Sequence, residues 1–440
     1  MRNTLVLRRS SALAQLVTIL SLGACACVSA VACGGSPSNG GGGDAGPVGT
    51  SRQPQQTDSG DMTNPGSDDG ATVVQGGGDD ATATPPGDDG STPITLPKSD
   101  ASVPGPNGGY PAGWLYTSGN KIMVSTGSTG MQWMGRGVNM DDIFLCGYNN
   151  TLYESDPQSL EETVVSGLVS GWKPSFVRMS LSMNSYKKVS WLSNPAQYKT
   201  PMTNIIKDIG SKGLYVLVTL RSEASMILGD PSNTEATGIP SDSTNTPDKT
   251  NYPTGTDAVY QALVDTFATD NFVLFGLTNE AGGNARSDAT ISGAMNHAVG
   301  TIRAEEDKLG VPHHIVTVQG NGYSSNLKMY TANPSPITHD NVVYELHYYP
   351  TLAGETPSNY QYSSTLPMIV GEYGDFSSSV PQSGFYSDME SKMIPNLAWD
   401  FDAFSGCAPD LLNTTMDPTK LQPTAWGKTV QSYLLAHPKQ

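Results

Sequence analysis

The chain has 440 residues, with 24 basic against 41 acidic side chains, a formal net charge of −17 and 37% hydrophobic residues. The acidic excess argues against a nucleic-acid partner. The histidines are scattered and the cysteines few, with no His-Glu-x-x-His motif and no glycine-rich phosphate loop after a strand. We therefore predict no metal site and no cofactor, so that any chemistry comes from the chain's own side chains.

Residues 1–33 are predicted to form an export signal of the bacterial lipoprotein type. Basic residues near the start precede a largely apolar run over 11–32, which ends in small residues and cysteines. Two cysteines fit lipidation: Cys25 follows Leu-Gly-Ala, and Cys33 directly precedes a glycine-rich tract. A lipidated cysteine would anchor the protein at the cell surface, whereas an ordinary signal peptide would release it as a secreted protein. Both alternatives stay open.

Residues 34–105 consist mainly of Gly, Ser, Thr, Pro and Asp, with recurring Asp-Asp pairs flanked by glycine. A segment of this composition buries too little apolar surface to fold, so we predict a disordered tether. Its aspartates supply much of the negative charge and keep the segment solvated.

Residues 106–440 are long enough for one barrel domain. Eight short apolar runs recur along them, at 133–140, 175–182, 214–220, 272–277, 314–319, 341–346, 368–370 and 397–401. These runs are continuous rather than alternating, as expected for parallel strands covered on both faces. Between several of these runs, apolar residues recur at helical spacing, which predicts helices over 254–270 and over 291–309, the latter with Gly310 as its C-cap. Residues 424–436 are predicted to form a closing helix. The pattern favours a (β/α)8 TIM barrel.

Two carboxylates follow expected strands of this barrel. Asn279 and Glu280 end the fourth strand and Glu372 ends the seventh, 92 residues after Glu280. Active sites of such barrels lie at the carboxyl ends of the strands, so the two acids should face each other. A pair of acids suits hydrolysis of a glycosidic bond. An Asn-Glu pair alone would more often cap or be solvated, but Arg178 lies between apolar residues and requires a buried carboxylate partner.

At this point the domain resembles glycoside hydrolase family 5, the cellulase-like (β/α)8 hydrolases, over nearly all of its length. The matching motifs, in strand order, are Gly137-Val138-Asn139, Phe176-Val177-Arg178, Asn279-Glu280, His347-Tyr348-Tyr349, Gly371-Glu372-Tyr373-Gly374 and Trp399. Each motif is weak alone, and their joint order carries the resemblance.

The resemblance implies that Glu280 is the acid/base and Glu372 the nucleophile of a retaining double displacement. Arg178 would hold Glu372 ionised through a charge-assisted hydrogen bond. Asn279 would bind the sugar 2-hydroxyl. His347 and Tyr349 would orient the acids and the sugar, and Trp399 would offer the sugar ring an apolar face.

The third expected strand departs from the family pattern. Many members have a histidine near its end, but here the strand ends at Arg221. This arginine either holds substrate or a carboxylate, or points into the following loop. Residues 221–257 are rich in Ser, Thr, Asn, Pro and Gly, which predicts a loop that walls the cleft or acts as a lid. Cys146 and Cys407 follow the first and eighth strands, which are neighbours in a closed barrel, so we predict a disulfide between them.

The expected substrate is a β-linked polysaccharide cut by a monomeric enzyme. An endo-acting β-1,4-glucanase is the first expectation and a β-mannanase the second, because the family resemblance leaves the polymer open. A third reading, from another class, is a surface lipoprotein that binds glycans without cleaving them. The paired glutamates and Arg178 argue against it, since a binding module needs neither acid.

Overall fold

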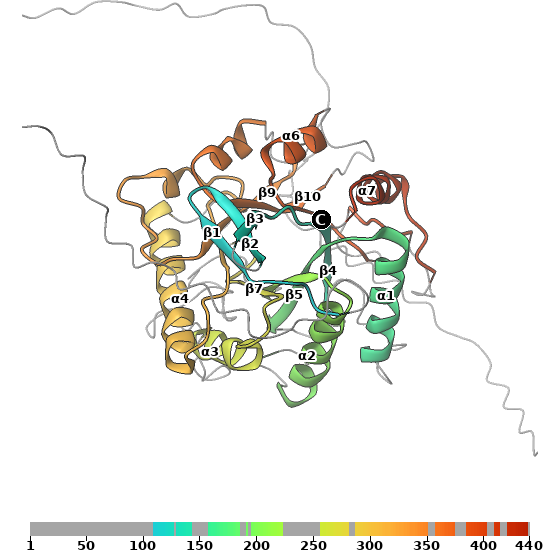
Figure 1. Cartoon of the computed structure of the whole chain (residues 1–440), viewed down its shortest axis with the longest axis horizontal. Helices are drawn as coiled ribbons and strands as arrows, with labels where there is room; N and C mark the ends of the chain where they lie inside the picture. The colour runs from blue at the N-terminus through green and yellow to red at the C-terminus, as the bar shows by residue number, and fades with distance from the viewer. Residues whose placement is uncertain are drawn as a thin grey trace, which may run out of the picture. The chain divides into compact units, whose positions relative to one another are not determined.

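Eight strands form the centre of the computed structural model (Figure 1). They are β4 (Arg136–Asp141), β5 (Phe176–Asn184), β6 (Tyr215–Ser222), β7 (Val273–Gly276), β8 (Val316–Gln319), β9 (Val342–Tyr348), β10 (Met368–Tyr373) and β11 (Asn396–Ala398). They pair in the order β10-β11-β4-β5-β6-β7-β8-β9 as a closed barrel, and every pair is parallel. Each lies within or overlaps one of the eight expected runs, so the predicted (β/α)8 barrel is confirmed.

The structure describes residues 109–126, 129–142, 157–184, 191, 195–222, 256–280, 287–350, 357–374, 384–402, 409–413 and 420–438. The predicted signal segment with Cys25 and Cys33, the predicted tether, and both cysteines of the predicted disulfide lie outside these ranges, as does most of the predicted lid. Within the described ranges, no helix is both long and apolar enough to cross a membrane.

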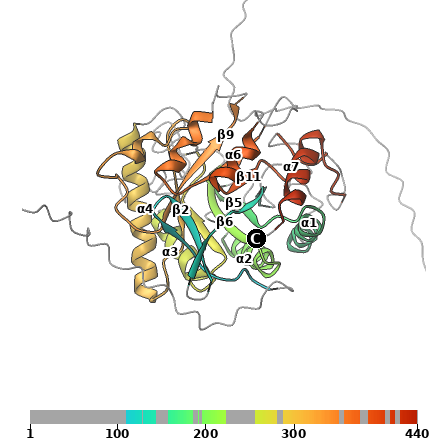
Figure 2. The same ribbon diagram turned by 45° about the horizontal axis from the view of Figure 1, so that its top comes forward.

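The helices lie around the outside of the barrel (Figures 1 and 2). They are α1 (Pro157–Trp172), α2 (Pro195–Ser211), α3 (Thr256–Phe267), α4 (Asp288–Leu309), α6 (Phe385–Lys392) and α7 (Ala425–Ala436), with 3-10 turns η2 (Lys328–Thr331) and η3 (Pro357–Ser364). The Ser287 hydroxyl caps α4 by accepting the Thr290 N–H, and Gly310 ends it in the left-handed region at φ 66°. The predicted C-cap is thus confirmed, as is the closing helix α7.

The barrel strands are buried on both faces because helices cover the outside and side chains fill the inside. All residues of β4, β9 and β10 are buried, which explains why their sequences are continuous rather than alternating. Polar residues are also buried in the barrel strands, among them Asn139 of β4, Arg178 of β5 and Glu345 of β9, each with no more than 1% exposure. Such residues require partners inside the barrel.

A small antiparallel sheet precedes the barrel and was not predicted. It contains β1 (Leu115–Ser118), β2 (Lys121–Thr126) and β3 (Thr129–Gln132) in that order. The chain then enters the barrel at Trp133, whose indole packs edge-on against Phe176 and Tyr215 at centroid distances of 5.0 and 5.3 Å. Those two residues begin β5 and β6, so Trp133 closes the end of the barrel at which the strands start.

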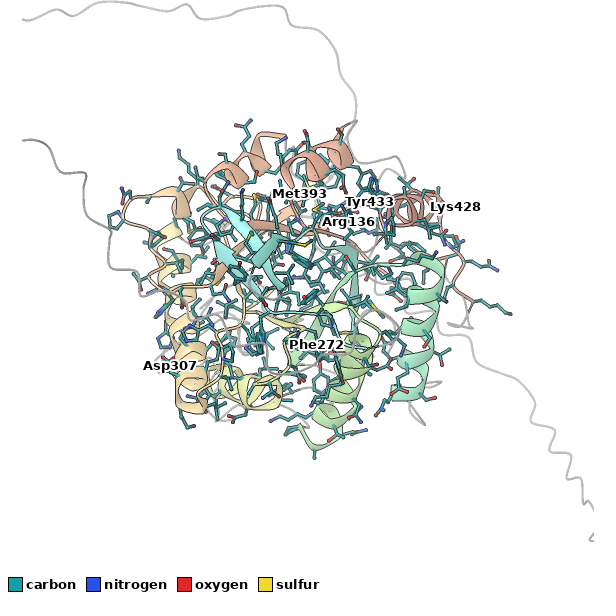
Figure 3. All side chains as sticks on the ribbon, viewed as in Figure 1. Arg136, Phe272, Asp307, Met393, Lys428 and Tyr433 are labelled. Atoms are coloured by element: carbon teal, nitrogen blue, oxygen red, sulfur yellow. The ribbon has the colours of Figure 1, made fainter. Side chains whose placement is uncertain are left out.

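An ion pair ties the same end of the barrel to two helices. Arg136, the first residue of β4, donates from Nε and Nη2 to the two carboxylate oxygens of Glu390 in α6, at 2.7 and 2.6 Å. The Tyr433 hydroxyl of α7 donates to the same carboxylate at 2.6 Å, and Figure 3 labels Arg136 and Tyr433 side by side. This bidentate geometry fixes α6 and α7 against the strand.

Replacement of Glu390 tests the contribution of this ion pair to stability. In Glu390→Ala the nearly buried Arg136 loses its acceptor, so we expect the free energy of unfolding to fall by about 2–3 kcal/mol. Urea unfolding measures the difference. Glu162→Ala, on the outer helix α1, is the control and should change stability by less than about 0.5 kcal/mol; equal values for both variants would contradict the assignment.

Candidate active site

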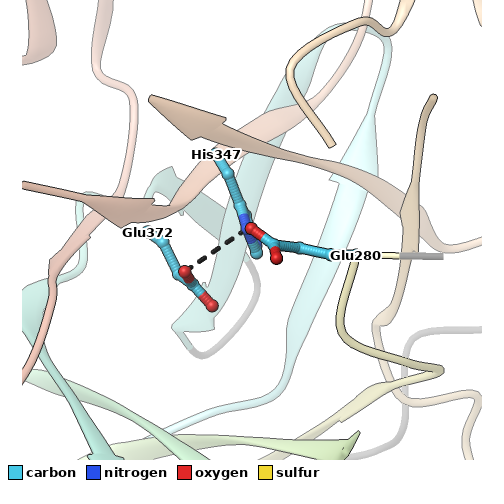
Figure 4. A group of neighbouring side chains, drawn as sticks. All are labelled: Glu280, His347 and Glu372. Carbon is cyan, nitrogen blue, oxygen red and sulfur yellow. Dashed lines mark hydrogen bonds and ion pairs between the residues drawn. The ribbon is translucent and has the colours of Figure 1, made fainter. Parts of the chain in front are cut away.

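Three predicted site residues meet at the carboxyl end of the barrel. Glu280 lies four residues beyond β7, His347 belongs to β9 and Glu372 to β10. One carboxylate or imidazole atom from each lies within 4.8 Å of the others, and Figure 4 shows the three side chains converging from three separate segments. Their convergence at this end agrees with where barrel sites form.

Glu280 is positioned by an unusual backbone conformation. Its φ is 52°, a left-handed value that is uncommon for residues other than glycine and is often found at functional sites. Its N–H donates to Gln319 Oε1 at 2.5 Å, which compensates for the end of the β7 ladder. Its side chain is 15% exposed, and Oε1 lies 2.9 Å from His347 Nδ1. The side chain is therefore both oriented and open to a ligand.

Glu372 is held from two sides. Its Oε1 accepts a hydrogen bond from Arg178 Nη1 at 2.8 Å, and its Oε2 accepts one from the Tyr349 hydroxyl at 2.9 Å. Its side chain is 5% exposed. Burial, together with the charges of Glu372 and Glu280, raises the pKa of Tyr349 well above its usual range. Tyr349 thus remains a hydroxyl donor toward the carboxylate.

Arg178 of β5 connects most of the site. Besides Glu372, its Nη1 donates to Asn139 Oδ1 at 2.9 Å and its Nη2 donates to Asn279 Oδ1 at 2.7 Å. Its Nε lies 2.8 Å from Glu345 Oε1 in a second buried ion pair. Burial alone would lower the pKa of Arg178, but the charges of Glu345 and Glu372 outweigh it and raise the pKa. The guanidinium therefore stays charged although it is fully buried.

Glu345 of β9 was not among the predicted site residues. It lies beneath the site, fully buried, and accepts a hydrogen bond from Thr317 Oγ1 at 2.6 Å in addition to its pairing with Arg178. His347 Nε2 lies 3.2 Å from the same carboxylate. The sequence did contain a signal for it, because a glutamate flanked by Tyr344 and Leu346 in an apolar strand requires a buried cation.

Gly371 makes room for Glu345. A Cβ atom at position 371 would lie 2.2 Å from Glu345 Oε1 and 2.5 Å from its Cγ, and the carboxylate cannot move away because three partners hold it. The pairing of β10 with β9 also shifts register between Val370 and Glu372. Irregularities of this kind re-aim side chains next to active sites, and here the shift occurs directly before Glu372.

Opposite charges alternate across the site. Burial alone would raise the pKa of Glu345, but the charge of Arg178 and the hydrogen bond with His347 lower it to about 2. For His347 burial favours the neutral form, yet the charge of Glu372 and hydrogen bonds with Glu280 and Glu345 raise its pKa to about 9. The imidazolium has a carboxylate acceptor at each ring nitrogen, which explains why the charged form is favoured.

Trp399 and Arg221 lie together at the ends of β11 and β6. Trp399 is 5% exposed but is not part of the continuous hydrophobic core. The Arg221 guanidinium carbon lies 5.1 Å from the centre of its ring, within cation–π distance. Arg221 Nη1 also donates to Asp141 Oδ1 at 3.1 Å. Of the two alternatives for Arg221, the structure shows that it holds a carboxylate.

The closed barrel and the carboxylates at its carboxyl end define a class of barrel hydrolases with paired acids. Residues 142–405, more than half of the chain, match the family model described as "Cellulase (glycosyl hydrolase family 5)". The chain belongs to this family and is a glycoside hydrolase. No curated protein sequence matches the chain significantly.

Solved structures with similar folds include both glucanases and a mannanase. The cellulase Cel5C_n has a TM-score of 0.56 and 18% identity, over 75% of this chain and 94% of that one. The catalytic domain of an endoglucanase from Thermobifida fusca, in complex with cellotetraose, has a TM-score of 0.54 and 17% identity over 73% and 97%. A β-mannanase from Streptomyces thermolilacinus, solved with mannohexaose, has a TM-score of 0.50 and 16% identity, over 74% of this chain and 97% of that one. At these identities the likeness supports the fold alone.

The role of Glu345 can be tested with the Glu345→Gln variant. Loss of a charge-assisted hydrogen bond costs about 1.5–3 kcal/mol, so we expect kcat on a soluble β-glycan to fall about 10- to 100-fold. The pKa of His347 should also fall, which moves the alkaline limb of the pH–rate profile to lower pH. Glu162→Gln serves as the control, and a variant with unchanged kcat and unchanged profile would refute the role.

Proposed function

We propose that the protein is a retaining glycoside hydrolase in which Glu280 is the acid/base and Glu372 the nucleophile. The observation that carries this proposal is the approach of a Glu280 oxygen to within 4.8 Å of a Glu372 oxygen. Retaining enzymes have carboxyl groups about 5–5.5 Å apart, whereas inverting enzymes need about 6.5–9.5 Å to admit a water molecule.

In the first step an oxygen of Glu372 attacks the anomeric carbon while Glu280 transfers its proton to the leaving glycosidic oxygen. The hydrogen bonds donated by Arg178 and Tyr349 hold the Glu372 carboxylate in position before attack. In the second step Glu280 accepts a proton from water, and the water oxygen displaces Glu372 from the sugar. Both residues return to their starting protonation states.

The remaining predicted residues support this chemistry. Because Asn279 Oδ1 accepts from Arg178, its amide N–H groups are left to donate to the sugar 2-hydroxyl, where contacts strengthen in the transition state. His347 bridges Glu280 and Glu345 and so orients the acid/base. Trp399, which is buried apart from the hydrophobic core, would provide the apolar face for the sugar ring at the cleavage point.

The proposed substrate is a β-1,4-glucan cleaved internally. The family description and the similar glucanase structures favour this polymer. A β-mannanase is the alternative, favoured by the similar mannanase fold. A glycan-binding protein without activity is a weaker candidate, since binding alone gives no reason to bury Arg178 between two carboxylates and two amides.

For cellular placement we propose export by residues 1–33, followed by lipidation at Cys25 or Cys33 or by release as a secreted protein. Residues 34–105 would act as a flexible tether and 106–440 as the catalytic domain, a monomer with the Cys146–Cys407 disulfide and without a cofactor. A tethered hydrolase at the bacterial surface could reach an insoluble polymer while remaining attached.

Two substitutions test the assignment of the acids. Glu280→Gln removes the general acid and should lower kcat/KM on natural polymer about 10²- to 10⁴-fold. Glu372→Ala should remove nearly all activity, and azide should partly restore it with an inverted glycosyl azide as product, because the small anion replaces the nucleophile. Glu162→Gln is the control. Full activity in either variant would reject its assigned role.

A panel of polymers separates the substrate alternatives. Reducing-sugar release is measured on carboxymethylcellulose, barley β-glucan, glucomannan and galactomannan, with Glu280→Gln as the inactive control. We expect glutamate-dependent release from carboxymethylcellulose and β-glucan. Release from galactomannan alone would establish the mannanase alternative, and polymer binding without release by the wild type would establish the binding-only alternative.

The pH dependence should have two limbs, because one glutamate acts ionised and the other protonated. On the alkaline side the raised pKa of His347, about 9, also affects folding. Because this pKa is higher in the folded state than in the unfolded state, where it is about 6.5, protonated His347 stabilises the folded state. The stabilisation is fully present below about pH 6.5 and is lost as the pH rises through about 9. We expect the melting temperature to fall between about pH 7 and 10 less steeply in His347→Gln than in the wild type; parallel curves would contradict this.

A further inference from the structure

A second group of acids lies beside the proposed active site, just beyond β11. One carboxylate oxygen from each of Asp400, Asp402 and Asp410 lies within 4.8 Å of the others. Asp400 and Asp402 are fully buried. The backbone fixes their approach to Asp410, because the Asp400 N–H donates to Pro409 O at 3.2 Å and the Leu411 N–H donates to Asp400 O at 2.8 Å.

Asp400 has no protein partner for its carboxylate among the residues that the structure describes. Both side-chain oxygens are buried without a hydrogen bond, and so is Oδ1 of Asp410. No ion pair reaches either side chain in the same ranges. A buried carboxylate in this position costs several kcal/mol unless it is protonated or neutralised by a cation.

The nearest protein cation is already engaged. Arg221 pairs with Asp141 and lies over Trp399. Its charge lowers the pKa of Asp400, but this effect is smaller than the opposing effects of burial and of neighbouring carboxylates. Burial and the charges of Asp402, Asp141 and Asp410 raise the pKa of Asp400 well above its usual range. Among the described residues, the charges acting on Asp400 are therefore mainly those of other carboxylates.

We propose that Asp400, Asp402 and Asp410 bind a calcium ion. Among the residues that the structure describes, the donor set consists of three carboxylates, and hard divalent cations prefer oxygen ligands. One oxygen from each acid lies within 4.8 Å of the others, close enough for a single ion with metal–oxygen distances of about 2.4 Å to contact all three.

The ion would join residues 400–402, directly after Trp399, to Asp410. Asp400 follows Trp399 directly in the chain, and Asp410 precedes Leu411, which pairs with Asp400 through the backbone. Calcium would therefore fix the indole from behind. This effect on Trp399 rests on the proposed function, whereas calcium binding itself does not.

The test measures calcium binding and stability in the purified protein rather than activity. After treatment with EDTA and transfer to metal-free buffer, CaCl2 is titrated by calorimetry, and melting temperature is followed against CaCl2 or MgCl2. We expect one calcium ion bound at the cluster, a melting temperature that rises with calcium concentration by mass action, and a weaker response to magnesium. No heat and no shift with CaCl2 would overturn the proposal and leave Asp400 as a buried protonated acid.

Variants locate the ion. Asp400→Asn should abolish the calcium-dependent shift, and Asp410→Asn, at a partly exposed position, provides the same test if Asp400→Asn does not fold. Asp265→Asn, on the outer face of α3, is the matched control and should retain the shift. If both cluster variants bind calcium like the wild type, the ion lies elsewhere, for example on the aspartate-rich residues 34–105, and the proposal is wrong. Loss of the calcium shift with unchanged hydrolysis would support the site and remove only its effect on Trp399.

Discussion

The buried guanidinium of Arg178 is the interaction on which the site depends. A fully desolvated arginine is tolerated only with carboxylates at hand, and here Glu372 and Glu345 supply them at 2.8 Å each. Because the same group also holds the side-chain oxygens of Asn139 and Asn279, one cation fixes residues from several strands. The positions of Glu345 and Glu372 are therefore determined inside the barrel, by strand residues rather than by the surrounding loops.

Contacts that stabilise the barrel lie at the end where the strands begin, and the proposed catalytic residues lie at the opposite end. At the end where the strands begin, Trp133 and the Arg136–Glu390 pair close and tie the structure. At the other end, charged groups replace apolar ones, and each carboxylate of the Glu280, Glu345 and Glu372 set faces Arg178 or His347. Like charges at this spacing would repel strongly without the intervening cations, so the alternation of charge lets the two glutamates lie close together.

The fold could be predicted from the sequence because continuous apolar runs and apolar residues at helical spacing indicate which faces are buried, and these patterns can be recognised within short stretches of the chain. The strand-end acids and Arg178 could be named because their motifs occur in family order. Glu345 was missed although its apolar neighbours indicate a buried charge, because the partner that gives it a role, Arg178, lies 167 positions earlier in the chain. The sheet β1 to β3 was missed because its strands are short and partly exposed. The surroundings of Asp400 depend on backbone hydrogen bonds with Pro409 and Leu411, which no local pattern encodes.

The close approach of Gly371 to Glu345 also restricts how this protein could have evolved. The two positions share one volume, so a side chain at 371 and a glutamate at 345 exclude each other. Position 371 can accept a side chain only if the residue at 345 is smaller, and that change would leave the Nε of Arg178 without the carboxylate that now faces it. Relatives with a residue other than glycine at the position of 371 should therefore lack a glutamate at the position of 345.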